Sequence, residues 1–235
     1  MEAGRTGDPV RKDEAKRRAK TDSSIDVALF GRMIADDADL NVDAAAQVAH
    51  AISVHAVTNE YDYFTAVDDH KNADAEEDAG AGMIGTVEFN SATLYRYAAV
   101  DVDRLYDTLG DPAATRRAVE AFVRAFVTSM PTGKQNTFAN RTLPDAVLVV
   151  ARETQPINLV GAFEEAITDE RRIPAALDRL ATHATELHDA YGETPLAAWT
   201  FGPGDRLAPL GRIADRSDLD STVTAIGDTV SARLS

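Results

Sequence analysis

The sequence predicts an α+β fold, in which short strands and amphipathic helices alternate along the chain. Three observations support this class. Strand-like apolar, β-branched and aromatic runs occur at 25–30, 61–67 and 146–151. Segments with apolar residues at helical spacing lie between them, at 41–56 and after Asp111. Hydrophobic residues make up 44% of the 235 residues, which is enough to bury a sizeable core.

The first half of the chain contains three expected strands and one expected helix. Residues 25–30 alternate between apolar and polar side chains before turning apolar, which is typical of a strand. Residues 41–56 are expected to form a helix that Asn41 caps. Its apolar stripe consists of Val42, Ala45, Ala46, Ala49 and Ile52. Strands follow at 61–67 and at 86–102, and the latter is long enough to contain a bulge or bend.

The second half begins with a helix that Asp111 caps and that carries Pro112 in its first turn. The remaining elements are expected in the order of a loop at 130–142, a buried strand at 146–151, helices at 159–166 and 169–191, a turn at 202–205 and a helix at 221–234. The first six elements follow the order strand, helix, strand, strand, helix, strand. Ferredoxin-like and RRM-like domains have this order, and their sheets commonly bind single-stranded RNA. Because a fold does not determine function, the order only favours RNA binding.

The overall charge of −15 argues against nucleic-acid binding, since phosphate contacts need cations. Two facts weaken this objection. Only five of the 24 basic residues are lysine and aspartate is abundant, a composition that fits a salt-adapted proteome whose surfaces are acidic whatever the function. Net charge also says little about a local patch. The absence of cysteine excludes disulfides and thiolate zinc sites and favours the cytoplasm. No membrane-length apolar run or secretory signal is visible.

The charges are unevenly distributed. Residues 1–24 hold seven basic and five acidic residues, which predicts a flexible, mildly basic tail or the remnant of an insertion. Residues 60–78 hold eight acids and one lysine, and 70–82 are expected to form a solvated loop. Residues 121–144 contain no acid, although Arg124, Lys134 and Arg141 lie there. An anion site must exclude carboxylates, because like charges weaken binding.

The polar stretch at 131–137 lies inside this acid-free segment. Gly133 could let the backbone approach a phosphate, while Lys134, Gln135 and Asn136 donate hydrogen bonds to an RNA backbone. An ordinary exposed turn would explain the same residues equally well. The aromatic residues at 61–64 could stack on bases, or they could pack into the core from one face of a strand.

Catalytic and metal-binding patterns are weak. The histidine pairs at 50 and 55 and at 183 and 188 are five residues apart, which does not place both rings on one helical face. Neither a nucleophile motif nor a complete phosphate-binding loop is present. We therefore expect no catalytic residue, metal or cofactor. The alternative function is a metal-dependent endoribonuclease that uses Asp68 or Asp69. The other interpretation of these two residues is a pair of solvated carboxylates at the end of a strand.

Several blocks together resemble the CasC family, the crRNA-binding backbone subunit of the type I-E CRISPR complex Cascade and a member of the RAMP superfamily. The blocks are 27–33, 45–53, 62–69, 85–91, 95–98 and 125–139. The resemblance is firm over 25–163 and looser afterwards. It implies an RRM-like palm at 25–190 with a β-hairpin thumb at about 60–90, and a helical C-terminal extension at 191–235. It also implies that the N-terminal portion of the family fold is missing from this chain.

The family resemblance implies a non-catalytic subunit of an antiviral complex. Its copies stack head to tail along crRNA through an open, heterologous interface. Each thumb displaces one base, and the remaining bases pair with target DNA, which is contacted only through the guide. The implied partners are crRNA, further copies of the chain and other Cascade subunits, without a membrane. A truncated relative that is unable to hold RNA is a further alternative.

The resemblance also assigns RNA-contacting residues by position. Tyr63, Phe64 and Thr65 correspond to the stem of the thumb. Met33, directly after Arg32, corresponds to the residue that meets a thumb tip across the RNA. The palm loop on the crRNA backbone corresponds to Lys134, Gln135, Asn136 and the neighbouring Arg141.

Overall fold

The computed structural model describes residue 14 and residues 24–66 and 83–235. The first half contains α3 (Ile25–Phe30), η1 (Ala38–Leu40), β1 (Ala46–Val48), β2 (Ile52–Ser53), β3 (Glu60–Ala66), β4 (Met83–Phe89), β5 (Leu94–Tyr95) and β6 (Ala98–Val100). The second half contains α4 (Val102–Leu109), α5 (Pro112–Thr128), α6 (Gln135–Phe138), β7 (Val147–Ala151), η3 (Leu159–Phe163), α7 (Arg172–Tyr191), β8 (Ala197–Phe201), η4 (Asp205–Leu207), η5 (Leu210–Arg212), β9 (Asp215–Arg216) and α8 (Leu219–Arg233). This mixture confirms the α+β class. The acidic loop expected at 70–82 lies outside the described residues, as does the tail expected at 1–24, except for residues 14 and 24.

The described strands form small sheets and not one continuous sheet. β1 pairs with β6, β2 with β5 and β3 with β4, each in antiparallel orientation. The order of the remaining sheet is β7-β8-β9, with β8 antiparallel to β7 and parallel to β9. The predicted order of strands and helices is therefore wrong for the described residues. Its first strand is a helix, and its first helix is extended.

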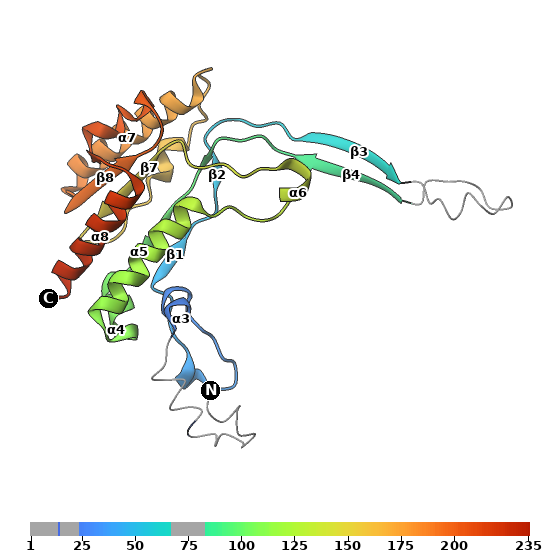
Figure 1. Ribbon diagram of the computed structural model, residues 1–235. Coiled ribbons are helices and arrows are strands. Elements are labelled where there is room, and N and C mark those ends of the chain that lie inside the picture. The colour runs from blue at the N-terminus through green and yellow to red at the C-terminus, as the bar shows by residue number, and fades with distance from the viewer. Residues whose placement is uncertain (1–13, 15–23, 67–82) are drawn as a thin grey trace.

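The β3–β4 hairpin extends away from the helices of the body (Figure 1). Each of its strands has seven residues, and the register runs from Glu60 opposite Phe89 to Ala66 opposite Met83. The strand predicted at 61–67 is thus confirmed. The single strand predicted at 86–102 is instead divided into β4, β5 and β6. Its segments separate because each pairs with a different partner, namely β3, β2 and β1.

Two apolar cores lie in the body. One gathers around α7, where buried residues of η3, η4 and η5 pack against the helix. The other lies between α3, α4, α5 and α8, and its centre includes Ala28, Leu105 and Ala118, which have no exposed surface. α8 lies along α5 (Figure 1). The C-terminal elements thus complete the two cores, and the hairpin contributes little to either.

The helix predicted at 41–56 is wrong, because these residues are extended. Val42 exchanges two backbone hydrogen bonds with Arg32, at 2.8 and 2.9 Å, and β1 pairs with β6. The backbone N–H of Ala45 donates to the carbonyl of Ala28 in α3, at 3.2 Å. The small side chains of Ala45 and Ala46 are buried in this contact. Pairing with distant strands here outweighs the helix propensity of alanine.

The strand predicted at 25–30 is also wrong, because the segment forms α3. The Ser24 hydroxyl accepts a hydrogen bond from the Val27 N–H at 3.3 Å and caps the helix. Gly31 ends it with φ of 78°, and its N–H donates to the carbonyl of Val27. Ala28 and Leu29 are adjacent in sequence and both buried. In a strand that covers a core with one face, adjacent side chains point to opposite faces, so only one of the two would be buried.

Several later predictions are confirmed. Asp111 caps α5 through hydrogen bonds from the Ala113 and Ala114 N–H groups, and Pro112 is the first helical residue. β7 forms within the predicted 146–151 strand, although its residues are half-buried and not buried. α7 begins three residues after the predicted start at 169, and α8 covers the final predicted helix.

Other predictions need correction. The segment at 159–166 forms the 3₁₀ helix η3 and not an α-helix, and the loop at 130–142 contains one helical turn, α6. α4, β8 and β9 were not predicted. Among the described residues, none of the helices combines the length and apolar character needed to span a bilayer.

A polar cluster joins the end of β7 to the end of α7. The Arg152 side chain is only 9% exposed. It donates one hydrogen bond to the carbonyl of Glu193 at 2.9 Å and another to Nε2 of His188. Burial and the nearby Arg152 charge lower the pKa of His188 below its ordinary value of 6.5.

The free energy of unfolding is therefore expected to fall as the pH drops below about 6.5. In this range His188 takes up a proton in the unfolded chain at a higher pH than it does in the folded chain. The folded pKa lies lower, so this stabilisation is complete above 6.5 and is lost towards acid. His188→Gln should reduce the loss between pH 7.5 and 5.5 in urea unfolding. His50→Gln, which changes an exposed histidine, is the control and should retain the loss. A pH profile that His188→Gln leaves unchanged would contradict the prediction.

Candidate nucleic-acid interface

One face of the β3–β4 hairpin is an exposed aromatic surface. Alternation and register place Tyr61, Tyr63 and Thr65 on this face with Ile84, Thr86 and Glu88. The exposed fraction is 66% for Tyr61, 64% for Tyr63 and 60% for Ile84. Core packing, the alternative considered for the two tyrosines, is therefore wrong for both. Exposed aromatic rings of this kind can stack on unpaired bases.

The opposite face of the hairpin is turned towards α6. The Phe64 ring covers Gly85, where an added Cβ would lie 2.6 Å from Phe64 Cζ. Phe89, on the same face, contacts Phe138 of α6 with ring centroids 4.6 Å apart. The ring contact places α6 and its loop beside the base of the hairpin (Figure 1). It joins residues 49 positions apart, 89 and 138, and sequence analysis missed it.

The base of the hairpin is tied to the body through the segment between β4 and β5. The N–H of Thr93 donates to Nε2 of the buried His55 at 3.1 Å, and its carbonyl accepts from Val54 at 2.9 Å. The Tyr95 hydroxyl donates to Oδ1 of Asn158 at 2.9 Å, and burial raises the pKa of Tyr95 to about 12. Its hydroxyl therefore stays protonated at neutral pH. These bonds fix the direction in which the hairpin leaves the body.

Lys134 begins the α6 turn in a left-handed backbone conformation, with φ of 63°. Its carbonyl accepts hydrogen bonds from the N–H groups of Thr137 and Phe138, at 3.1 and 2.9 Å. This conformation is unfavourable for a residue other than glycine by about 1 kcal/mol. Gly133 has open space around it and no positive φ. The residue that gives the turn its shape is thus Lys134 itself, and its side chain is exposed.

The other predicted loop residues lie around the same turn. Arg141 donates a hydrogen bond from Nη2 to Oε1 of Gln135 at 2.8 Å, which leaves the Gln135 NH₂ group as a donor. Asn136 is exposed. Asn140 donates weakly to the Gly133 carbonyl at 3.5 Å. The sequence prediction therefore located one compact group of hydrogen-bond donors, which extends from Lys134 to Arg141.

All three cations of the acid-free segment are exposed, but an acid elsewhere in the chain neutralises one of them. Arg124 forms an ion pair with Asp220 of α8, with Nη2 and Oδ1 2.6 Å apart. Arg141 lines an open cavity of about 250 Å³ together with Thr128, Ser129, Met130, Thr142 and Leu143. Sequence analysis did not identify Arg96, which lies 4.5 Å above the Phe126 ring and donates to the Phe126 carbonyl at 3.0 Å. Arg96 thereby fixes the end of α5, from which the loop departs.

α3 lies apart from the hairpin (Figure 1), and Arg32 and Met33 follow shortly after the end of this helix. The Arg32 Nε donates to the carbonyl of Leu40 at 2.9 Å, which holds its side chain against the loop between α3 and β1. Met33 is 86% exposed. The structure therefore divides the predicted site residues into two groups on different parts of the molecule.

Within the described ranges, no three His, Asp or Glu side chains gather in a way that could hold a metal ion. Asp68 and Asp69, the carboxylates of the endoribonuclease alternative, lie outside these ranges. The described site is therefore built from aromatic rings, amides and cations. Such groups bind and position nucleic acids.

Comparison with solved structures gives strong matches over most of the chain. One matched chain belongs to a structure described as "CRISPR RNA-guided surveillance complex, pre-nicking", with 34% identity and a TM-score of 0.76; the match covers 95% of this chain and 62% of that one. Another belongs to a "CRISPR RNA-guided surveillance complex", with 36% identity and a TM-score of 0.71; it covers 86% of this chain and 78% of that one. No curated protein matches the sequence.

Together, the fold and these matches support a Cas protein of the Cascade type. The model of the CT1975-like protein family matches residues 2–225, and the chain belongs to this family. The family resemblance noted in the sequence is therefore confirmed at the level of a Cascade-type protein.

Proposed function

We propose that the protein is a non-catalytic, crRNA-binding backbone subunit of a type I-E CRISPR complex, equivalent to CasC. Two observations carry this proposal together: one face of the hairpin is aromatic and exposed, and a cationic loop lies beside the base of the hairpin on its other face. Tyr61 and Tyr63 offer rings for bases, while Lys134 and Arg141 offer charge for phosphates. The membership in the CT1975-like family and the similarity to surveillance-complex chains support the same function.

In this proposal, the β3–β4 hairpin is the thumb, the other elements at 25–190 belong to an RRM-like palm, and residues 191–235 form a C-terminal extension. The thumb closes over crRNA and displaces one base, and the bases between successive thumbs pair with target DNA. The protein then contacts backbone and shape, while the sequence is recognised by base pairing.

The separation of the two residue groups fits a head-to-tail stack of copies. Met33 is highly exposed and follows α3, which lies apart from the hairpin of the same chain (Figure 1). A thumb from one copy could therefore meet Met33 and Arg32 of the next, which makes the interface heterologous and open. We propose that such a filament, with other subunits of the complex, acts in the cytoplasm.

The experiment that tests the proposed function is a salt series of binding to single-stranded crRNA by the wild-type chain and Lys134→Ala. Wild-type affinity should fall as salt rises, because bound phosphates release counterions. Lys134→Ala should weaken binding by about tenfold and reduce the slope of log affinity against log salt by about 0.7, the value for one contact to a single strand.

Lys134→Gly separates the charge of this residue from its backbone shape. Glycine adopts the left-handed conformation without strain, so the loop should keep its shape while the charge is lost. We expect Lys134→Gly to bind as weakly as Lys134→Ala. If Lys134→Gly instead retains wild-type affinity, the charge is not a phosphate contact. Failure of the wild-type chain to bind RNA at low salt would contradict the proposed function.

A further inference from the structure

The loop at 130–142 is held together by hydrogen bonds within itself. The backbone N–H of Gln135 donates to the Thr132 carbonyl at 3.3 Å, and the N–H of Ala139 donates to the Gln135 carbonyl at 3.0 Å. Nη2 of Arg141 donates to Oε1 of Gln135 at 2.8 Å. In the part of the chain that the structure describes, the hydrogen bonds of this loop all stay inside it. Its position on the molecule must therefore come from its two ends and from packing.

Phe138 makes the packing contact between this loop and the hairpin. Its ring lies against that of Phe89, the last residue of β4, with centroids 4.6 Å apart and ring planes tilted by 43°. A tilted arrangement at this distance is favourable for two aromatic rings. Neither phenylalanine belongs to the two apolar cores of the body. The ring pair therefore ties the loop to the hairpin, and its removal should leave both cores intact.

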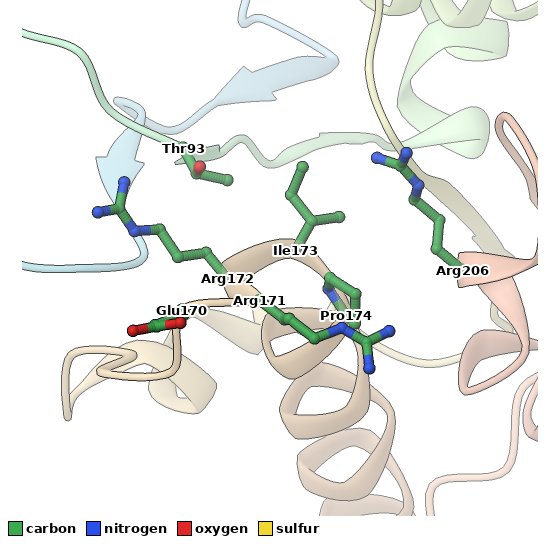
Figure 2. Close-up of a pocket in the computed structure, with 7 residues that line it drawn as sticks. All are labelled: Thr93, Glu170, Arg171, Arg172, Ile173, Pro174 and Arg206. Carbon is green, nitrogen blue, oxygen red and sulfur yellow. The ribbon is translucent and has the colours of Figure 1, made fainter.

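The α6 turn connects the Phe138 ring to the charge of the loop. Phe138 is the last residue of α6, and its backbone N–H donates to the Lys134 carbonyl at 2.9 Å. Lys134 precedes the turn and Ala139 follows it, with positive φ values of 63° and 48°. Left-handed conformations are unfavourable for such residues and persist only where surrounding contacts fix them. Loss of the ring contact should therefore release the turn and displace Lys134. The open pocket beside the start of α7, lined by residues such as Thr93 and Ile173 (Figure 2), takes no part in this connection.

The relative position of the two proposed RNA-contacting groups depends on this connection. Tyr61 and Tyr63 lie on the hairpin face opposite to the one that Phe89 and the loop occupy. The placement of the loop relative to the tyrosines is therefore set through the hairpin itself, in which Phe89 lies opposite Glu60, the neighbour of Tyr61. A site binds well when its contacting groups are held in place by the residues around them.

We propose that Phe138 is a positioning residue for RNA binding: through its contact with Phe89 it holds Lys134 where a bound strand places a phosphate. This inference rests on the proposed RNA-binding function and adds a residue that acts without touching the RNA. In this arrangement the hairpin and the loop bind as one unit, with bases on the exposed aromatic face and a phosphate at Lys134.

The test measures the salt dependence of binding to a single-stranded oligouridylate RNA. Phe138→Ala removes no charge, yet it should weaken binding by about tenfold and reduce the slope of log affinity against log salt by about 0.7, as Lys134→Ala does. Adding Lys134→Ala to Phe138→Ala should cause no further loss, because the phosphate contact is already absent. Phe89→Ala should reproduce the effect, since it removes the other half of the ring pair.

Two controls and one measurement without RNA separate positioning from loss of the fold. Phe138→Leu keeps an apolar side chain against Phe89 and should recover most of the salt slope. Leu196→Ala removes a residue that is 57% exposed and lies just before β8, so it should leave affinity and slope unchanged. In hydrogen–deuterium exchange, Phe138→Ala and Phe89→Ala should speed exchange at 135–139 and leave α7 and α8 unchanged.

The outcomes separate this inference from the proposed function. If Phe138→Ala keeps the wild-type salt slope, Lys134 does not depend on the ring pair and the positioning role is overturned. Additive losses when Phe138→Ala and Lys134→Ala are combined would overturn it as well. In both cases Lys134→Ala still reports the phosphate contact, so the proposed function stands. If the wild-type chain binds no RNA at low salt, the proposed function and this inference fail together.

Discussion

Replacing Tyr61 and Tyr63 together by alanine is expected to weaken single-stranded RNA binding by about 30-fold or more. Both rings are exposed on one face of the hairpin, so they are available to a base and are not part of a core. Stacking contributes roughly 1–3 kcal/mol for each base, and two rings therefore give about 30-fold even at the lower limit. Fluorescence anisotropy with a labelled oligonucleotide at constant salt would measure this loss.

Two matched variants show whether the rings themselves bind RNA. Changing both tyrosines to phenylalanine keeps the rings and should preserve most of the affinity. Tyr191→Ala removes a tyrosine that is 76% exposed at the end of α7, away from the hairpin, and should have little effect. An unchanged affinity in the double alanine variant, with intact circular dichroism, would exclude the hairpin face as a base-stacking surface.

Gly202→Ala is expected to lower the free energy of unfolding by about 3 kcal/mol or more, the upper range for local backbone strain. Gly202 follows β8 with φ of 154°, and a Cβ there would lie 2.4 Å from the Asp145 carbonyl oxygen and 3.1 Å from Ala146 Cα. These are backbone atoms that lead into β7. The β7–β8 pair would have to separate to accept the methyl group. Urea unfolding followed by circular dichroism would measure the change.

Two other glycines serve as controls for this substitution. Gly204 also has a positive φ, of 69°, but has no atoms within 4 Å, so Gly204→Ala should lower stability by about 1 kcal/mol, from backbone strain alone. Gly211 has open space and no positive φ, and Gly211→Ala should be nearly neutral. Equal losses for Gly202→Ala and Gly204→Ala would contradict the close contact between β7 and β8.

Local signals predicted the elements whose ends are set by neighbouring residues. Asp111 and Pro112 fixed the start of α5, because a cap and a proline act on the adjacent turn. The aromatic run at 61–64 identified β3, since such residues favour a half-exposed strand. The same kind of signal at Ser24 and Gly31 marks the ends of α3, although the apolar run between them was assigned to a strand.

Distant pairing decided the elements that sequence analysis got wrong. Residues 41–56 have a helical apolar period, but β6 and the loop after α3 supply their hydrogen-bond partners. β8 was missed because its sequence begins with two alanines and contains one β-branched residue, so its local strand signal is weaker than that of β7. It is stabilised by pairing with β7, about 50 residues earlier. Neither partner could be identified from the local period alone.

The candidate site shows the same division. The sequence by itself determined the chemistry of the hairpin and the loop, because the absence of acids at 121–144 and the aromatic run at 61–64 are properties of composition. Only the tertiary structure decided that Tyr61 and Tyr63 face solvent, that Phe89 packs against the loop, and that Arg124 forms an ion pair with Asp220. The reason is physical: exposure and ion pairing depend on which distant segments pack together, and a residue's own neighbours in sequence do not specify them.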